Sequence, residues 1–585
     1  MDKPGRELSS VLAVDVGEVN TRAILFDIVE GRYRFLAAGT APTLSSLPNW
    51  HISSAVRKAI DQLEEITGRR FLEQGEHLIT PERPDRSGVD AFVVTVSAGP
   101  PLKVIAIGLL EDISLQSARN LAQTTYSQVV ANLSLNDGLK PEERLDTILS
   151  HRPDLIVIAG GSENGSGRSI LRLVESVGLA CALMTADERP EVIYAGNQRL
   201  GGEVIKALEP LTRVYQAANI RPGLENEHLL PALSCVEQAC RSVLSRRTPG
   251  VMHLINWSAE HVHPTAIAFA RIIRFLSKVY DSSKGVLGVD VGASATTIAA
   301  AFSGDLTLRV YPQFGIGEQL ASFSNVLRLS EIARWLPLEV SEEYLRDYIF
   351  NKATHPSSLP VTAEDQAIEA ALARCMLRES IAMTARNFPK SLRRTNAGRL
   401  SWFEPIIAAG SVITKAPSPG QSLLILLDAL QPAGITTLVL DQNNLTPAIG
   451  AAGCLNPLLA VQVLESSAFL SLATVISPIS NARPGIPILR LKVTYQSGDE
   501  TSFEVKQGSL ETLPLPLGQS ARIRLLPFQK TDVGMGGPGR GGSLRVVGGA
   551  LGVVIDARGR PLRLPADPLR RSDLYKKWLW TLGGK

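Results

Sequence analysis

The first apolar segments of the chain predict a strand meander followed by an amphipathic helix. Three apolar runs, at 11–16, 21–28 and 33–39, are separated by short polar turns, as in antiparallel strands joined by hairpins. Residues 51–66 instead repeat apolar side chains every three or four positions, which is the spacing of one helix face. We therefore expect an N-terminal sheet that is covered on one side by a helix.

Between residues 112 and 205 the pattern alternates between helices and short buried strands. The spacing predicts a helix over 114–132 and strands over 154–161 and 180–185. Alternation of strand and helix is typical of a parallel sheet covered by helices. This region is therefore predicted to be a small parallel α/β unit inserted into a larger domain.

The last third of the chain changes pattern twice. An apolar stretch at about 458–479 carries Gln462, Glu465 and several serines, so we expect a buried or amphipathic helix and no membrane span. Beyond about residue 485, alternation of apolar and polar residues predicts a small antiparallel β domain with a basic tail. The domain boundaries that these changes predict are 1–112, 113–215, 216–484 and 485–585.

Composition narrows the class of protein. The chain has 585 residues, of which 20% are charged and 44% hydrophobic, as in a soluble protein of several domains. The net charge of +3 is too small to imply nucleic-acid binding. Five scattered cysteines, an odd number, fit a reducing compartment better than a disulfide framework. We expect a cytoplasmic protein without membrane insertion.

Two distant segments share one pattern that suits a phosphate ligand. The segments 11–27 and 286–299 each contain an apolar strand that ends in an aspartate, Asp15 or Asp290. A turn with glycine and hydroxyl or amide residues follows, and then a second apolar strand. Backbone N–H groups and hydroxyls of such a turn can bind anionic oxygens, and the aspartate can orient a hydrated Mg²⁺. We expect the two turns to face each other across one cleft.

Further motifs occur in an order that supports a family resemblance. They are Val96–Leu109, Pro153–Gly165, Val192–Asn197, Gly315–Gly317, Ala409–Ser411 and Leu440–Gly450. With the two aspartate turns, they make the chain resemble the MutL family of glutamate mutase accessory proteins, which is distinct from the mismatch-repair protein of that name. The resemblance covers residues 11 to about 480 and places the chain in the superfamily of actin, sugar kinases and heat-shock chaperone ATPases.

The resemblance implies both a fold and a ligand. The implied fold is α/β, an actin-like two-lobed ATPase (ribonuclease H-like) fold, to which the inserted unit and the C-terminal β domain are added. The implied ligand is ATP with Mg²⁺, with Asp15 and Asp290 as the catalytic and metal-orienting carboxylates. The phosphate contacts would come from Gly17, Asn20, Thr21, Gly292, Ser294, Thr296 and Thr297, and the adenosine contacts from Gly410 and Ser411.

Two departures from the family pattern bear on hydrolysis. A serine or threonine normally follows the glycine of the first turn, but this chain has Glu18, whose charge would repel a phosphate. In the second segment, the position after Thr297 is Ile298 where the family tends to have an aspartate. Phosphoryl transfer depends on positioning and charge neutralisation. We therefore expect at most a weak ATPase.

Three functions fit these features. The first is a nucleotide-binding accessory protein, chaperone-like or reactivase-like, whose implied partner is a cobalamin-dependent mutase. The second is a small-molecule kinase of the same superfamily, which would need a general base facing the phosphate. The third is a non-catalytic assembly protein with a degenerate nucleotide site.

The pair His261 and His263 has no cysteine or carboxylate at metal-ligand spacing, so we interpret both residues as bystanders that bind no metal.

Overall fold

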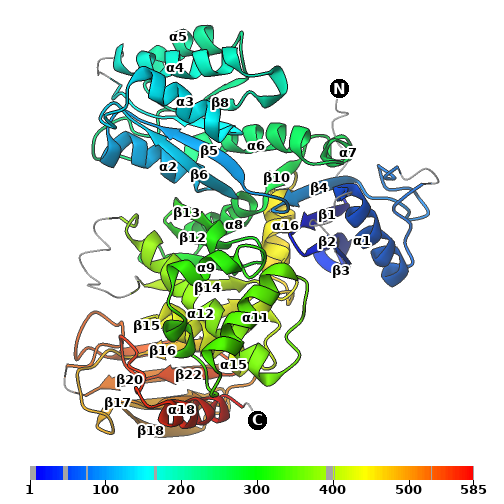
Figure 1. Cartoon of the computed structure of the whole chain (residues 1–585). Coiled ribbons are helices and arrows are strands. Elements are labelled where there is room, and N and C mark those ends of the chain that lie inside the picture. Colours follow the sequence, from blue (N-terminus) through cyan, green and yellow to red (C-terminus); the bar gives the residue numbers. More distant parts are fainter. Residues whose placement is uncertain are drawn as a thin grey trace. The chain divides into compact units, whose positions relative to one another are not determined.

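The computed structural model describes residues 8–43, 50–73, 77–163, 168–389, 400, 402–528 and 530–583. Its elements are labelled in Figure 1. The chain divides into two compact units. Unit 1 contains residues 1–268, 308–312 and 447–459, and unit 2 contains residues 269–307, 313–446 and 460–585.

Unit 1 contains the predicted N-terminal meander. Strands β1 (Ser10–Val16), β2 (Asn20–Val29) and β3 (Arg32–Pro42) pair antiparallel in sequence order. Strands β4 (Ala91–Val96) and β10 (Val262–Pro264) extend the sheet in parallel on the other side of β1. The resulting five-stranded order is β3-β2-β1-β4-β10.

Strand alternation decides which face of this sheet is covered by the predicted helix. Leu12, Val14 and Val16 of β1 share a buried cluster with residues of α1 (Ile52–Thr67) and α7 (Val251–Trp257). The helix α1 approaches β3 closely, since a Cβ on Gly39 would lie 2.1 Å from the carbonyl oxygen of Ala59. The predicted meander and helix are both confirmed.

The inserted region of unit 1 is a fully parallel sheet, as predicted. Its order is β6-β5-β7-β8-β9, which is that of flavodoxin-like doubly wound folds. The strands are β5 (Leu102–Ile107), β6 (Ser127–Leu133), β7 (Leu155–Ile158), β8 (Glu191–Tyr194) and β9 (Val214–Gln216). The main connecting helices are α2 (Gln116–Ala122), α3 (Pro141–His151), α4 (Arg168–Leu183) and α5 (Gly201–Leu208).

Two predictions within this region are wrong. The helix predicted over 114–132 ends at Ala122, where the hydroxyl of Ser127 donates to the Ala122 carbonyl, and β6 follows. The strand predicted over 180–185 is the end of α4 and the residues after it. Its apolar residues continue the buried helix face of Leu173, Val174 and Val177 at helical spacing.

Unit 2 repeats the strand order of unit 1. Strands β11 (Gly285–Val291) and β12 (Thr296–Phe302) pair antiparallel, and β13 (Asp305–Tyr311), whose residues 308–311 are counted with unit 1, lies beside β12. Strands β14 (Phe403–Ala409) and β15 (Gly434–Leu440) follow in parallel beside β11. A meander that gains two parallel strands next to its first strand is the ribonuclease H-like sheet. Its occurrence in both units confirms the actin-like ATPase fold class.

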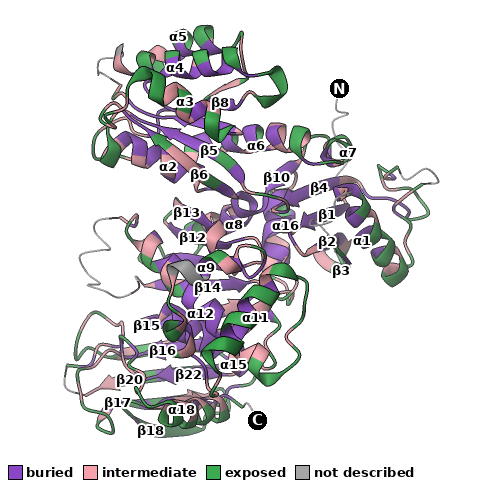
Figure 2. Cartoon of the chain, in the orientation of Figure 1, coloured by how far each residue is buried: buried purple, intermediate pink, exposed green. Residues whose placement is uncertain are grey.

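The sheet of unit 2 continues beyond these five strands. Its full order is β13-β12-β11-β14-β15-β16-β22-β19, eight strands in all. The helices α12 (Ala363–Ala385) and α15 (Pro419–Leu430) are largely buried, as Figure 2 shows. The long helix predicted at about 458–479 is wrong. The helix α17 (Pro457–Leu464) ends at Leu464, the hydroxyl of Ser466 donates to the Val463 carbonyl, and β16 (Leu470–Ser477) follows.

The C-terminal strands divide between two sheets. Strands β19 (Leu510–Leu513) and β22 (Val553–Asp556) complete the eight-stranded sheet. A separate four-stranded antiparallel sheet has the order β18-β17-β20-β21, and its inner face packs on β22 through a common apolar cluster. Its strands are β17 (Pro487–Tyr495), β18 (Glu500–Lys506), β20 (Ser520–Pro527) and β21 (Gly542–Val547). The chain then forms α18 (Pro568–Thr581).

None of the helices in the described ranges combines the length and the apolar character that crossing a bilayer requires.

Candidate nucleotide-binding turns

The two aspartate turns have the same length and the same closing hydrogen bond. In the first, the N–H of Gly17 donates to the carbonyl of Asn20 at 3.0 Å. In the second, Gly292 donates to Ala295, also at 3.0 Å. Asp15 pairs with Arg22 and Asp290 with Thr297 in the strand register. The turns therefore correspond residue for residue, and Ala293 occupies the position of Glu18.

Backbone contacts hold the second turn from one side. A Cβ on Gly315 would lie 2.2 Å from the carbonyl oxygen of Ala293, and Ile316 N–H donates to the Gly292 carbonyl at 3.0 Å. Within the described part of the chain, the backbone N–H groups of Ala293 and Ser294 make no hydrogen bond. A turn that is fixed by its neighbours and keeps such N–H groups open suits an anion.

Two of the predicted phosphate contacts have their hydroxyls bonded inside the protein. Thr21 is fully buried, and its Oγ1 lies 3.0 Å from Oγ1 of Thr43. Thr296 is also fully buried, and its hydroxyl donates to the Phe314 carbonyl at 2.6 Å. Both residues occupy the strand position next to the residue paired with the aspartate, so they face the opposite side of their sheets. In this structure they fasten each hairpin to the segment that follows.

The predicted adenosine turn lies at the end of the strand beside the second turn. Ala409 is in register with Asp290, and Gly410 follows with a φ of +95°. A Cβ on Gly410 would lie 2.2 Å from the carbonyl oxygen of Val291, so no larger residue fits without displacing β11. Ser411 then begins the short helix α14 (Ser411–Thr414). Asp290, Thr297, Gly410 and the second turn thus meet at one end of the unit 2 sheet.

Asp15 is buried among polar partners in unit 1. Its Oδ1 accepts a hydrogen bond from the Thr95 hydroxyl at 2.6 Å and from the Thr265 hydroxyl at 3.3 Å. The Arg22 guanidinium lies 3.9 Å from its Oδ2. These contacts offset the loss of hydration for a carboxylate that is 3% exposed. The side chain of Glu18, in the neighbouring turn, is also buried.

The strand register places Thr95, which the sequence analysis did not single out, next to Asp15. Thr95 pairs with Asp15 on one side and with His263 on the other, so all three side chains lie on the same face of the sheet. His263 Nδ1 lies 3.5 Å from Oε1 of Glu237 on α6 (Leu233–Arg247). The rings of His261 and His263 stack at 6.3 Å, and burial, followed by the nearby His263, lowers the pKa of His261.

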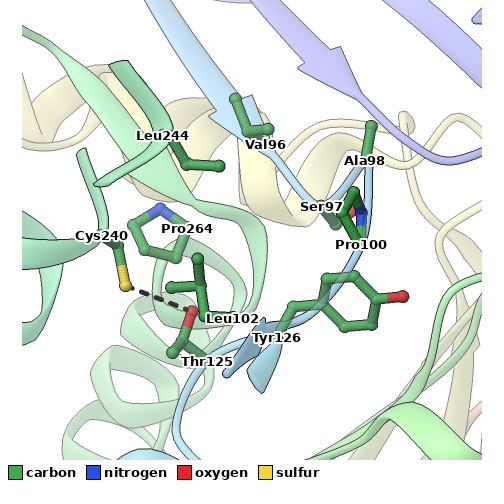
Figure 3. A pocket seen from close by; sticks show the side chains of 10 residues that line it. All are labelled: Val96, Ser97, Ala98, Pro100, Leu102, Thr125, Tyr126, Cys240, Leu244 and Pro264. Carbon is green, nitrogen blue, oxygen red and sulfur yellow. Dashed lines mark hydrogen bonds between the residues drawn. The ribbon is translucent and has the colours of Figure 1, made fainter. Parts of the chain in front are cut away.

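A small pocket in unit 1 is chemically different from the turns. It is lined mainly by apolar groups around Cys240, whose thiol donates to the Thr125 hydroxyl at 3.7 Å (Figure 3). Burial raises the pKa of Cys240 to about 12, so the thiol stays protonated. No charged side chain among the described residues lines this pocket, so it does not suit a phosphate ligand.

Among the described residues, no group of three or more histidine, cysteine, aspartate or glutamate side chains lies close enough together to hold a metal ion. Mg²⁺ that arrives with a nucleotide needs only one or two carboxylates, because phosphate oxygens and waters supply the other ligands. Asp15 and Asp290 therefore stay the predicted Mg²⁺ contacts, and their meeting across a cleft stays a prediction.

The repeated sheet defines the class as the actin-like ATPase fold, and comparison with known proteins gives the family. Residues 11–468 match the family model described as MutL protein, so the chain belongs to this family, the one of the glutamate mutase accessory type. The match ends before the four-stranded sheet. No curated protein matches the sequence.

Solved structures with some likeness come from several systems. The nucleotide-free structure of acetone carboxylase is 11% identical, with 86% of this chain and 81% of that chain covered and a TM-score of 0.32. The nucleotide-free diol dehydratase-reactivating factor is 9% identical, with 78% and 99% covered and a TM-score of 0.29. Component A of the (R)-2-hydroxyglutaryl-CoA dehydratase of Acidaminococcus fermentans is 8% identical, with 76% and 96% covered and a TM-score of 0.23.

Proposed function

We propose that this chain is a nucleotide-binding accessory protein that acts on another protein. The observation that carries the proposal is the repetition of one aspartate turn, with the same length and closing hydrogen bond, on two sheets of the same strand order. A repeated phosphate-binding device on this fold suits ATP with Mg²⁺, which is the ligand that the family resemblance implies.

Each predicted contact has a role in this proposal. The open N–H groups of Ala293 and Ser294, with the Ser294 hydroxyl, bind phosphate oxygens at the second turn. Thr297 adds its hydroxyl from the Asp290 face, and Gly410 and Ser411 hold the adenosine end. Thr21 and Thr296 act indirectly, since their hydroxyls keep the turns in shape. Gly17 and Asn20 contribute the backbone of the first turn.

We propose that hydrolysis is weak or absent. Oδ1 of Asp15 already accepts two hydroxyl donors, which reduces its capacity to orient a water or a metal-bound water. Ile298 is fully buried and apolar at the position where the family tends to have a second carboxylate. Phosphoryl transfer needs such groups, whereas nucleotide binding can rely on backbone donors and Mg²⁺.

Calorimetric titration tests the nucleotide part of the proposal. ATP with Mg²⁺ should bind the parent chain, and Asp290→Asn should weaken binding about tenfold or more, because a charged contact to the metal shell is lost. The matched control is Asp305→Asn, which removes an exposed carboxylate from β13 in the same unit. Absence of ATP binding by the parent, or equal affinity in Asp290→Asn and Asp305→Asn, would refute the assignment.

The partner that we propose is a cobalamin-dependent mutase, on the strength of the family. The test is recovery of a mutase, inactivated by damage to its cofactor, when the chain, ATP and fresh cobalamin are added. The expected result is recovery that requires both the chain and ATP. If the chain binds ATP but recovery never exceeds that with cobalamin alone, the mutase assignment is wrong while the nucleotide assignment stands.

A small-molecule kinase is the second candidate, and the position of His263 is the observation in its favour. A kinase of this class needs a general base, and His263 with Glu237 lies in the same row of side chains as Asp15. The two functions are separated by ATP consumption. Turnover that requires one added metabolite, and that His263→Ala abolishes, would favour the kinase.

A further inference from the structure

The outer face of the four-stranded sheet carries an unusual group of cations. Outward positions of β17, β20 and β21 hold five exposed basic residues, of which Arg490 pairs with Glu504 and the other four form one group: Lys492, Arg522, Arg524 and Arg545. We call this group the basic face. We propose that the basic face docks an acidic surface of a partner protein. The proposal goes beyond nucleotide binding, because the face lies outside the part of the chain that matches the family.

The strand register brings these cations together in pairs. Lys492 is directly opposite Arg524, and Arg522 is directly opposite Arg545. Across the described ranges, none of the four forms an ion pair. Among the described residues, the group makes one side-chain hydrogen bond, in which the Arg545 guanidinium donates to the Ser520 hydroxyl at 3.1 Å. The charges of the basic face are therefore available to a ligand.

Folding does not explain this arrangement. Like charges directly opposite each other on neighbouring strands destabilise a sheet. Natural proteins place lysine or arginine on edge strands to prevent sheet-to-sheet aggregation. The edges of this sheet are β18 and β21, however, whereas Lys492, Arg522 and Arg524 lie on the two central strands, β17 and β20. A surface that opposes stability without protecting an edge is best explained by binding.

The chemistry of the surrounding residues favours a protein over a nucleic acid or a membrane. The neighbouring strand β18 presents Glu500 and Glu504 on the same outer face, and Glu504 pairs with Arg490 at 2.7 Å. These carboxylates would repel a phosphate backbone or an anionic lipid layer, but a protein surface can offer both signs of charge. Three of the four cations are arginines, whose planar fork fits carboxylates in a bidentate manner.

Most binding sites for single-stranded nucleic acids stack the bases on aromatic rings, and the basic face offers no free ring for this among the described residues. Base recognition on a sheet relies on exposed aromatic rings. The outward positions of the four strands hold no aromatic residue among those described, and the ring of Phe528, just after β20, already lies 5.4 Å from the Arg490 guanidinium. We therefore assign the basic face to an acidic polypeptide surface.

Binding of a labelled polyglutamate peptide to the full chain tests this assignment. The face variant, K492E/R522E/R524E, reverses three charges on the two central strands. The control variant, K58E/R172E/K206E, makes the same change in net charge at exposed positions of α1, α4 and α5. We expect the face variant to lose about tenfold or more in peptide affinity and the control variant to keep that of the parent. Binding to the parent should also weaken as salt is raised.

Three outcomes would overturn the assignment. The first is no peptide binding by the parent, and the second is an equal loss in both variants, which would reduce the effect to net charge. The third is tighter binding of phosphatidylserine vesicles or of duplex DNA than of the peptide, if the face variant alone loses it. Thermal unfolding shows whether the face variant is folded, and we expect a single cooperative transition as in the parent.

Discussion

At the scale of single residues, the shape of the second turn depends on the absence of side chains at Gly315 and Gly317. A Cβ on Gly315 would lie 2.2 Å from the Ala293 carbonyl oxygen, and one on Gly317 would lie 2.7 Å from the same oxygen. Neither contact is with a flexible side chain, so the backbone of the turn would have to move. The open N–H groups of Ala293 and Ser294 would move with it.

We therefore expect Gly315→Ala to impair both stability and nucleotide binding. Overpacking of this kind costs about 1–3 kcal/mol in the free energy of unfolding. Urea unfolding and ATP calorimetry on one preparation measure both effects. The control is Gly223→Ala, because nothing lies within 4 Å of a Cβ at Gly223. Unchanged stability and affinity in Gly315→Ala would show that the turn does not depend on this contact.

Thiol reactivity offers a second prediction at this scale. Burial raises the pKa of Cys181 to about 11 and that of Cys375 to about 12, and Cys240 is affected in the same way. These thiols stay protonated at neutral pH and should react with Ellman's reagent only after unfolding. Exposed Cys454 should react first in the native protein, and Cys454→Ser should remove that fast phase. Because Cys235 is half-buried, the deciding variant is Cys235→Ser/Cys454→Ser, and a fast phase that survives in it would contradict the burial of the other three thiols.

The sequence predicts the turns but not the partners of their carboxylates. The turn pattern is local, because an aspartate, a glycine and two apolar strands lie within a few residues of one another. The hydroxyls that bind Asp15 come from residues 80 and 250 positions away in the chain. His263 joins the same face only through the parallel pairing of β10 with β4, which no local pattern reveals.

At the scale of elements, local patterns predict hairpins well and the ends of helices poorly. The three-strand meander and the parallel unit are confirmed because alternation and short turns encode them. The second half of the helix predicted over 114–132 is the strand β6, because Thr124, Thr125 and Ser127 at the boundary are compatible with either structure. The apolar residues of 180–185 suit a strand or a helix equally, and the core beneath α4 decides for the helix.

In the four-stranded sheet, two substitutions are predicted to change the free energy of unfolding in opposite directions. Arg522→Glu would place a carboxylate opposite Arg545 and beside Arg524, and so should raise the free energy of unfolding by about 0.2–1 kcal/mol. Arg490→Glu would face Glu504 across the strands and should lower it by a similar amount. Urea unfolding at low salt measures both, since guanidinium ions would screen the charges. Arg522→Glu less stable than the parent would show that the basic face is not repulsive.

At the scale of the whole molecule, a buried network of charges joins distant parts of unit 2. Asp428 of α15 pairs with Arg374 of α12 at 2.9 Å and with Arg558 at 2.8 Å. Asp556, at the end of β22, pairs with Arg558 at 2.9 Å and with Arg560 at 2.8 Å. The Arg558 guanidinium also lies 4.5 Å from the Trp578 ring on α18. The last strands of the eight-stranded sheet and the C-terminal helix are thus tied to the core helices.

Removal of Asp556 should destabilise this network strongly. Asp556→Asn would leave the buried Arg558 and Arg560 without their shared carboxylate, a loss of about 3–5 kcal/mol in the free energy of unfolding. Burial alone would raise the pKa of Asp556, but the charges of Arg558 and Arg560 outweigh it and hold that pKa well below the ordinary value of 3.8. Because the unfolded chain binds the proton more readily, the stabilisation is full above that ordinary value and is lost as the pH falls below it.

The pH dependence separates this charge effect from simple packing. In the parent, the free energy of unfolding should fall as the pH is lowered below about 4, and the fall should be shallower in Asp556→Asn, which has no proton to take up there. Asp499→Asn, at an exposed turn between β17 and β18, should keep both the stability and the steeper fall. Urea unfolding from neutral to acidic pH measures all three proteins. If Asp556→Asn loses stability but keeps the parent's acid slope, the network contributes through packing, and the charge pairing of Asp556 is not what holds the C-terminal strands.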